Sequence, residues 1–167
     1  MEIFVFETFF FFFPAWITNM LFVVVGALAS ALRVPDVPID FSKNFFDGRR
    51  LLGDNRNVGV ACAGLIIGIA AGYLVVGDFS VSLLGAGGSF LGHTLLGSFI
   101  KRRLGFPSGH KFPFLDRIDA TACAALLLIL FADMPLRHAI FGIALAFTFH
   151  PLISFLGYTL KMKKNPW

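Results

Sequence analysis

Five apolar runs, each long enough or nearly long enough to cross a bilayer, constrain this chain more than any other feature of its sequence. A helix that spans the hydrocarbon core needs about 20 apolar residues. The runs that meet or approach this length cover residues 10–32, 58–76, 79–100, 117–131 (the shortest) and 138–160. Because backbone N–H and C=O groups must be paired inside a bilayer, such runs form helices. We therefore predict an all-α integral membrane protein with five transmembrane helices in a single membrane domain, residues 1–167.

The few charged residues lie mostly between these runs. Lys, Arg, Asp and Glu make up 14% of the sequence, whereas about 25% is usual for a soluble domain. The formal net charge of +4 does not indicate a nucleic-acid-binding protein, because the cations are confined to short segments beside a membrane. This distribution favours phosphate-bearing lipids and nucleotides as partners.

Basic residues flank the apolar runs on one side. Lys and Arg concentrate in the cytoplasmic loops of membrane proteins. Of the 14 Lys and Arg residues, five lie in residues 33–57, five in or beside residues 101–116 and three in the tail, which makes 13 on one face; Arg137 lies on the other. We therefore predict an N-terminus outside the cell, with two long cytoplasmic loops and a cytoplasmic C-terminus.

Glycines recur at four-residue intervals in the second and third apolar runs. They are Gly64, Gly68 and Gly72 in one run, and Gly88 and Gly92 in the other. Small residues at this spacing let membrane helices approach closely. We interpret both sets as helix-packing positions rather than as sites of chemistry.

The first long loop alternates carboxylates with cations. Its acidic residues are Asp36, Asp40, Asp47 and Asp54, and its basic residues between and after them are Lys43, Arg49, Arg50 and Arg56. Membrane orientation accounts for the cations but not for the carboxylates. The pattern favours a folded site in which carboxylates order the cations or hold a metal, and in which arginines bind phosphate. A solvated loop with salt bridges is the alternative.

The second long loop carries basic residues at its start and two carboxylates at its end. Asp116 and Asp119 are three residues apart and lie on one face if a helix has begun there. Mg²⁺ is bound in proteins by one or two carboxylates with waters and substrate phosphates. The alternative is that Asp116 caps the helix and Asp119 is a favourable charge in its first turn. His93, Thr94 and His150 interrupt apolar runs, where hydrogen-bonded packing is the simplest interpretation.

Two blocks of this sequence resemble the CDP-diacylglycerol synthase family. Ser98, Lys101 and Arg102, followed by Asp116-Arg117-Ile118-Asp119, resemble its signature. The first loop, with Asn44-Phe-Phe-Asp-Gly-Arg-Arg50 and Leu52-Gly-Asp-Asn55, resembles the archaeal branch, the CDP-archaeol synthases. The resemblance implies a cytidylyltransferase of phospholipid biosynthesis. Its substrates would be CTP and an unsaturated archaeal ether-lipid phosphate, a glycerol phosphate with two geranylgeranyl ethers, and its products CDP-archaeol and pyrophosphate.

The resemblance also implies roles for individual residues. Catalytic roles fall to Lys101, Arg102, Asp116 and Asp119, with Asp116 and Asp119 holding Mg²⁺ at the cytoplasmic face of the cell membrane. Substrate-binding roles fall to residues of both loops: Asp40, Lys43, Asn44, Asp47, Gly48, Arg49, Arg50, Gly53, Asp54, Ser98 and Arg103.

The chain departs from the family pattern at two places. Arg56-Asn57-Val58 stands where Lys-Thr and a basic residue are expected, and His93 and Thr94 stand where an acidic residue is expected. Other functions stay open. The same chemistry could act on phosphatidate, or the protein could be a non-enzymatic anion transporter. A CDP-alcohol phosphotransferase is disfavoured because Asp47-Gly-Arg-Arg lacks that family's further downstream carboxylates.

Overall fold

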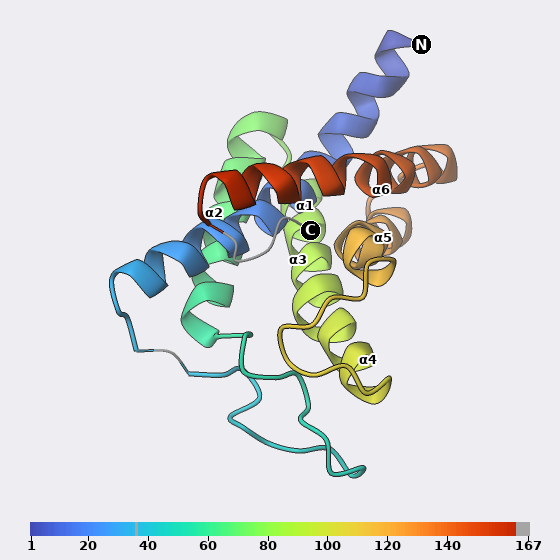
Figure 1. Cartoon of the computed structure of the whole chain (residues 1–167). Helices are drawn as coiled ribbons and strands as arrows, with labels where there is room; N and C mark the ends of the chain where they lie inside the picture. The colour runs from blue at the N-terminus through green and yellow to red at the C-terminus, as the bar shows by residue number, and fades with distance from the viewer. Residues whose placement is uncertain (36, 163–167) are drawn as a thin grey trace.

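The computed structural model describes residues 1–35 and 37–162 of the chain. Asp36, Lys163 and Lys164, which the sequence analysis counts among the loop and tail charges, lie outside the described residues. The described part is helical (Figure 1), and its helices are α1 (Glu2–Ala31), α2 (Val58–Val76), α3 (Phe79–Ser89), the π-helical η1 (Phe90–Leu96), α4 (Gly97–Arg103), α5 (Leu115–Phe131) and α6 (Leu136–Thr159).

Four helical segments are long and apolar enough to cross a bilayer. They are Glu2–Ala31, Val58–Val76, the continuous helix Phe79–Arg103, and Leu136–Thr159. The prediction of an all-α, multi-pass membrane protein is thus confirmed. The 17 residues of α5 measure about 25 Å, slightly less than the roughly 30 Å of a hydrocarbon core. The number of five spans therefore stays a prediction.

The first helix begins earlier than the sequence analysis predicts. It starts at Glu2 rather than near residue 10. Glu2 and Glu7 interrupt the apolar run without breaking the helix, and a carboxylate in the first turn is favourable at the positive end of the helix dipole. Pro14 is accommodated inside α1, where it packs against Gly72 and Gly85.

The predicted glycine positions pack helices closely, as expected. Gly64, Gly68 and Gly72 of α2 face α1, and a Cβ atom on Gly68 would lie 2.0 Å from the Thr18 Oγ1. On the other side of the bundle, Gly88 meets the α5 backbone, where a Cβ would lie 2.4 Å from the Ala124 Cα. Close backbone approach of this kind replaces the hydrophobic driving force that membrane helices lack.

A π-helical turn interrupts the third apolar run between Phe90 and Leu96. The Gly97 N–H donates to the Gly92 carbonyl, five residues back. Such a turn changes the direction of the side chains that follow it, and π-turns recur at functional sites. His93 lies in the middle of this turn, and Ser98 and Lys101 follow it.

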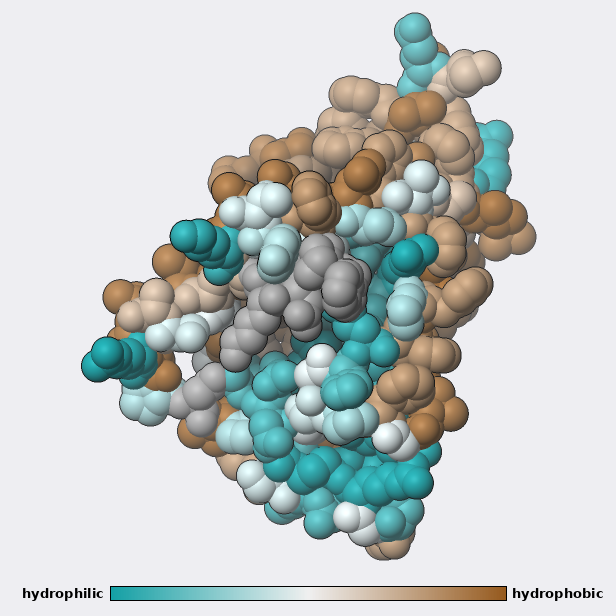
Figure 2. Space-filling model, in the orientation of Figure 1, coloured by the Kyte–Doolittle hydropathy of each residue, from teal (hydrophilic) through white to brown (hydrophobic). Residues whose placement is uncertain are grey.

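Polar residues gather at one end of the molecule. Figure 2 shows a hydrophilic surface over α4 and the long loops, while the helical body above it is mainly apolar. The N-terminus lies at the opposite end from these loops (Figure 1). This separation is what a bilayer around the helices and water around the loops would produce.

Candidate active site

The first long loop is folded around the Asp40 side chain. Asp40 is 4% exposed and accepts hydrogen bonds from the Arg50 guanidinium at 2.8 Å and from the backbone N–H groups of Leu52, Gly53 and Ser42 at 2.9–3.1 Å. Burial alone would raise the pKa of the Asp40 carboxyl. The bonds from Arg50 and three backbone groups outweigh burial and lower the pKa to about 2. Asp40 is therefore ionised at any physiological pH.

Arg50 is held on both sides by carboxylates. It pairs with Asp40 and also with Asp54, and the hydrogen bonding that it donates to Asp40 is the main reason that its pKa is raised. The resemblance predicts that Arg50 binds substrate. In the structure its donors are engaged inside the loop, where they hold residues 40–54 in one arrangement.

Arginines join the two long loops to each other. Arg49 donates to the carbonyl of Arg103 at 2.6 Å, and Arg103 donates to Asp47 at 2.8 Å and to the carbonyl of Arg50 at 2.7 Å. The Arg103 guanidinium also lies over the Phe45 ring, 4.7 Å from its centroid. The loops thus meet at one end of the bundle, 50 or more residues apart in sequence, as a shared site requires.

Gly53 sits where the two loops approach each other closely. Its φ of +106° is a conformation that favours glycine, and a Cβ there would lie 2.7 Å from the Ser108 Oγ. Both the backbone conformation and the close approach thus account for glycine at this position.

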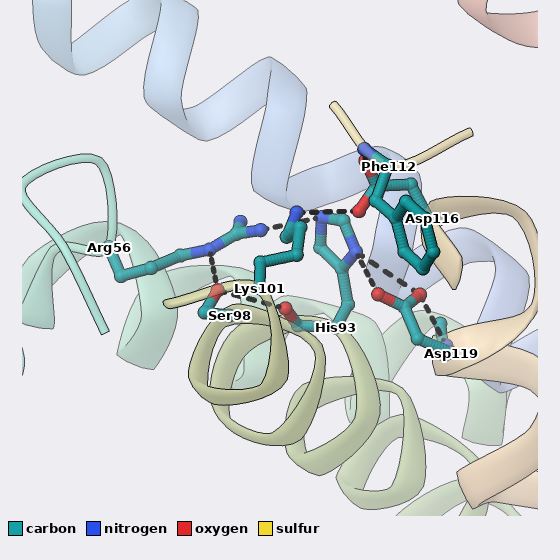
Figure 3. A network of polar contacts seen from close by, with 8 residues as sticks. Arg56, His93, Ser98, Lys101, Phe112, Asp116 and Asp119 are labelled. Atoms are coloured by element: carbon teal, nitrogen blue, oxygen red, sulfur yellow. Dashed lines mark hydrogen bonds and ion pairs between the residues drawn. The ribbon is translucent and has the colours of Figure 1, made fainter. Parts of the chain in front are cut away.

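A polar network extends from the first loop through the π-turn to α5 (Figure 3). Arg56 donates from Nε to the Ser98 hydroxyl at 2.8 Å, and its Nη2 lies 3.2 Å from the His93 Nε2. The other ring nitrogen, Nδ1, lies 3.1 Å from the Asp119 carboxylate. A guanidinium can only donate, so His93 Nε2 accepts and Nδ1–H donates to Asp119. The hydrogen-bond partners thus define a neutral imidazole between a cation and a carboxylate.

A second pair lies beside this network. The Lys101 ammonium is 2.5 Å from Asp116 Oδ1, and the Phe112 N–H donates to Asp116 Oδ2 at 2.9 Å. Lys101 is only 5% exposed. Asp116 and Asp119 project from the first turns of α5 toward the helix that carries Lys101 and His93 (Figure 3), so the expected placement of both carboxylates on one face is found.

The two departures from the family pattern contact each other. Arg56 and His93, 37 positions apart, form the hydrogen bond just described. From the sequence alone, His93 is interpreted as a hydrogen-bonded packing residue, and Arg56 is not among the predicted site residues. Both residues depart from the family pattern in the same chain, which was the one clue in the sequence to a relation between them. That clue alone does not show that their side chains touch.

An elongated cavity of about 690 Å³ joins this cluster to the apolar interior. Its polar wall includes Arg56, His93, Ser98, Lys101, Arg102 and Asp116. Its apolar wall comes from α1 and α6, with side chains such as Phe9, Phe13, Leu145 and Phe149. The cavity therefore has one end suited to a charged group and another suited to hydrocarbon.

Arg102 supplies a cation at this cavity that forms no ion pair with the residues that the structure describes. It is 6% exposed, and its Nε and Nη1 have no hydrogen-bond partner among the residues that the structure describes. A buried guanidinium without acceptors costs free energy. An anion bound in the cavity would supply those acceptors.

Not every predicted site residue reaches the cavity. Of the first-loop residues, Leu52, Asn55 and Arg56 contribute to its wall. Most of the predicted substrate-binding residues of that loop are exposed and lie outside this wall: Lys43, Asn44, Asp47, Gly48, Arg49 and Asp54. Their positions fit a role in loop folding or in contact with a group that extends out of the cavity.

The carboxylates suit a metal ion that is held partly by substrate. Within residues 1–35 and 37–162, no group of three or more His, Cys, Asp or Glu side chains could form a protein-only metal site. Asp116 lines the cavity, and Asp119 lies behind His93. Mg²⁺ commonly uses one or two carboxylates and takes its remaining ligands from water and phosphate, so the donor set fits Mg²⁺ with a bound nucleotide.

Comparisons with known proteins agree with this geometry. A relative from Pyrobaculum aerophilum named CDP-archaeol synthase is 36% identical over 78% of this chain and 82% of its own length. A second, from Pyrobaculum arsenaticum, carries the same name and is 37% identical over 85% of this chain and 88% of its own.

Structural comparison gives the same result. A solved structure described as an intramembrane enzyme for archaeal membrane lipids biosynthesis has a TM-score of 0.69 and 28% identity, covering 86% of this chain and 90% of that chain. The family model described as CarS-like, CDP-archaeol synthase, matches residues 1–167. The resemblance read from the two loops is confirmed, and the chain belongs to the CDP-archaeol synthase family.

Proposed function

We propose that this protein transfers the cytidylyl group of CTP to an archaeal ether-lipid phosphate and so forms CDP-archaeol and pyrophosphate. The chain is a CTP-dependent transferase of lipid biosynthesis by its family. The observation that carries the proposal is the cavity, which places buried cations and the Asp116 carboxylate at one end and hydrocarbon-lined walls at the other. A lipid phosphate has the same division of charged and apolar parts.

The reaction forms one phosphorus–oxygen bond and breaks another. An oxygen of the lipid phosphate attacks the α-phosphorus of CTP, and the bond from that phosphorus to the oxygen shared with the β-phosphorus breaks, releasing pyrophosphate. The attacking oxygen is already ionised at neutral pH, so the site needs no strong general base. The main obstacle is repulsion between two polyanions.

The chain meets this obstacle with fixed cations. Arg102 offers unpaired donors to a phosphate at the cavity, and Lys101 lies beside it. Ser98 and His93 hold Arg56 in place through hydrogen bonds, so that its charge does not need to reorganise during the reaction. Mg²⁺ held by Asp116 and Asp119 would add neutralisation of the CTP phosphates.

The same arrangement does not favour the other candidates. An anion transporter would need a polar path across the bilayer, whereas Figure 2 shows the hydrophilic surface concentrated at the end of the molecule that carries α4 and the long loops. Phosphatidate differs from the archaeal substrate in its chains rather than in its phosphate. The archaeal lipid is preferred because the curated relatives carry the name CDP-archaeol synthase.

A direct assay tests the proposed function. The purified protein, given α-labelled CTP, Mg²⁺ and the geranylgeranyl ether-lipid phosphate, is expected to transfer label into the lipid phase and release unlabelled pyrophosphate. Phosphatidate is expected to be a poorer acceptor. Absence of label in lipid, from protein that is folded and binds CTP, would contradict the proposal.

The active site is further proposed to face the cytoplasm, with α5 as a fifth span. At its start, Asp116 contacts Lys101 at the loop end of the bundle. After its end, a short connection leads to His138, which hydrogen-bonds Thr8 near the N-terminus of α1. A helix that connects these two ends runs through the thickness of the bundle despite its modest length. Five crossings then place both loops and the C-terminus on one side.

Cysteine accessibility can measure this topology. With Cys62 and Cys123 replaced by serine, a single cysteine at Glu2 is expected to react with a membrane-impermeant reagent applied outside the cell. A cysteine at Lys43, in the first loop, should react only after the membrane is opened. The reverse pattern would show the opposite orientation, and reaction of both from outside would contradict a membrane crossing by α1.

A further inference from the structure

A polar side chain interrupts the apolar wall that α1 gives to the cavity. Asn19 lies near the middle of α1 and lines the cavity together with apolar neighbours such as Ile17, Met20 and Val23. Its side-chain amide forms no hydrogen bond with any residue in the part of the chain that the structure describes. Uncharged polar groups inside a span are costly unless they have a partner, so the free amide indicates a ligand.

A second donor lies one turn away on the same helix face. Trp16 also lines the cavity, and its indole Nε1 is buried without a hydrogen-bond partner among the described residues. Positions three apart are neighbours on a helix surface. Trp16 and Asn19 therefore place two polar groups side by side on the α1 wall of the cavity. Beyond them, toward Phe13 and Phe9, this wall is apolar.

The position of Asn19 along α1 places it relative to the charged cluster. Phe22 of α1 and Arg56 both line a second, smaller cavity, which places this part of α1 beside the charged cluster. Asn19 is three residues before Phe22, about 4.5 Å along the helix axis toward the N-terminal, apolar end. It thus lies between the cations and the hydrocarbon-lined part of the cavity.

We propose that the Asn19 amide donates a hydrogen bond to an oxygen that joins the glycerol of the lipid substrate to a hydrocarbon chain, which makes Asn19 a specificity-determining residue. This inference rests on the proposed function for the identity of the lipid. The linking oxygens are a few bonds from the lipid phosphorus. They are acceptors without a donor of their own, and an amide N–H₂ complements them.

Lipid binding without CTP tests the inference separately from turnover. The chain has two tryptophans, Trp16 and Trp167, so a Trp167→Phe background makes Trp16 fluorescence a reporter of the cavity. The titrants are a geranylgeranyl-type ether-lipid phosphate and an analogue in which methylenes replace the two linking oxygens. The background protein is expected to bind the ether lipid about fivefold more tightly, the effect of one hydrogen bond.

Asn19→Leu is expected to remove this preference, so that both lipids bind within twofold of each other. The comparison is made within one variant, so partial misfolding cancels. Thr148→Val is the matched control, because Thr148 is a polar residue of α6 that is exposed and bonded only to the Ala144 carbonyl, and it should keep the preference.

Retention of the preference in Asn19→Leu, or its absence in the background protein, would overturn the inference, as would failure of either lipid to bind. CTP turnover is measured in the same samples. Preferential binding of the ether lipid without any CDP-lipid product would contradict the proposed function but would still support the role of Asn19 in lipid binding.

Discussion

Asp119→Asn is expected to lower turnover at least about 1,000-fold, a loss of roughly 4 kcal/mol of transition-state stabilisation. Asparagine keeps the size of the side chain and an oxygen that can accept from His93 Nδ1–H. The change therefore removes the negative charge and little else. If Asp119 holds Mg²⁺ with Asp116, loss of that charge removes a metal ligand, and a metal ion supplies several kcal/mol in reactions of this kind.

The rate is measured at saturating Mg²⁺ and CTP, with Asp116→Asn beside it and the same result expected. Asp133→Asn is the matched control. Asp133 is exposed, lies between α5 and α6 away from the cavity, and has a φ of +48°, which asparagine tolerates as well as aspartate does. A near-normal rate for Asp119→Asn would show that Asp119 is not a ligand and serves to orient His93.

The order of the helices and the meeting of the two loops could be predicted from the sequence because both depend on local signals. Apolar length identifies a span, and the clustering of Lys and Arg identifies its flanks. The start of α1 was missed because Glu2 and Glu7 mimic the polar flank of a span, although a helix can continue past them.

The contact between Arg56 and His93 could not be predicted because no period or spacing links positions 37 apart. It depends on the π-turn at Phe90–Leu96, which sets the direction of His93. No residue pattern in this stretch distinguishes a π-turn from an ordinary helix. The packing of Gly92 against the Asp119 backbone is a tertiary contact, which the local sequence does not specify.

The sequence also does not show whether a loop arginine binds a carboxylate of the protein or a phosphate of the substrate. Both groups offer the same acceptor geometry to a guanidinium. Arg50 and Arg102 look alike in sequence, because each stands in a short run of adjacent basic residues. In the structure Arg50 is neutralised by Asp40 and Asp54, whereas Arg102 is buried with unpaired donors at the cavity. The sequence predicts that both arginines bind phosphate, whereas the structure gives Arg50 a role in loop folding and places Arg102 at the cavity. Mutants of the two loops can measure this difference.

Lys101→Met is expected to lower kcat/KM at least about 30-fold, or roughly 2 kcal/mol, without unfolding the loops. Methionine keeps the packing of the lysine stem and removes the ammonium. Because Lys101 is buried at the cavity and paired with Asp116, its charge would act on a desolvated phosphate, where a charge-assisted hydrogen bond is worth about 1.5–3 kcal/mol.

Arg50→Met provides the contrast, since it removes a cation of the first loop that contacts carboxylates rather than the cavity. Its effect on rate should come with faster amide hydrogen exchange at Leu52 and Gly53, whose N–H groups bond to Asp40 and depend on Arg50 to keep that carboxylate in place. Lys101→Met should leave exchange at both amides unchanged, so the two variants separate charge at the cavity from order in the loop. If Lys101→Met stays within twofold of the unmodified protein, Lys101 does not act on the substrate phosphates and the Lys101–Asp116 pair is structural.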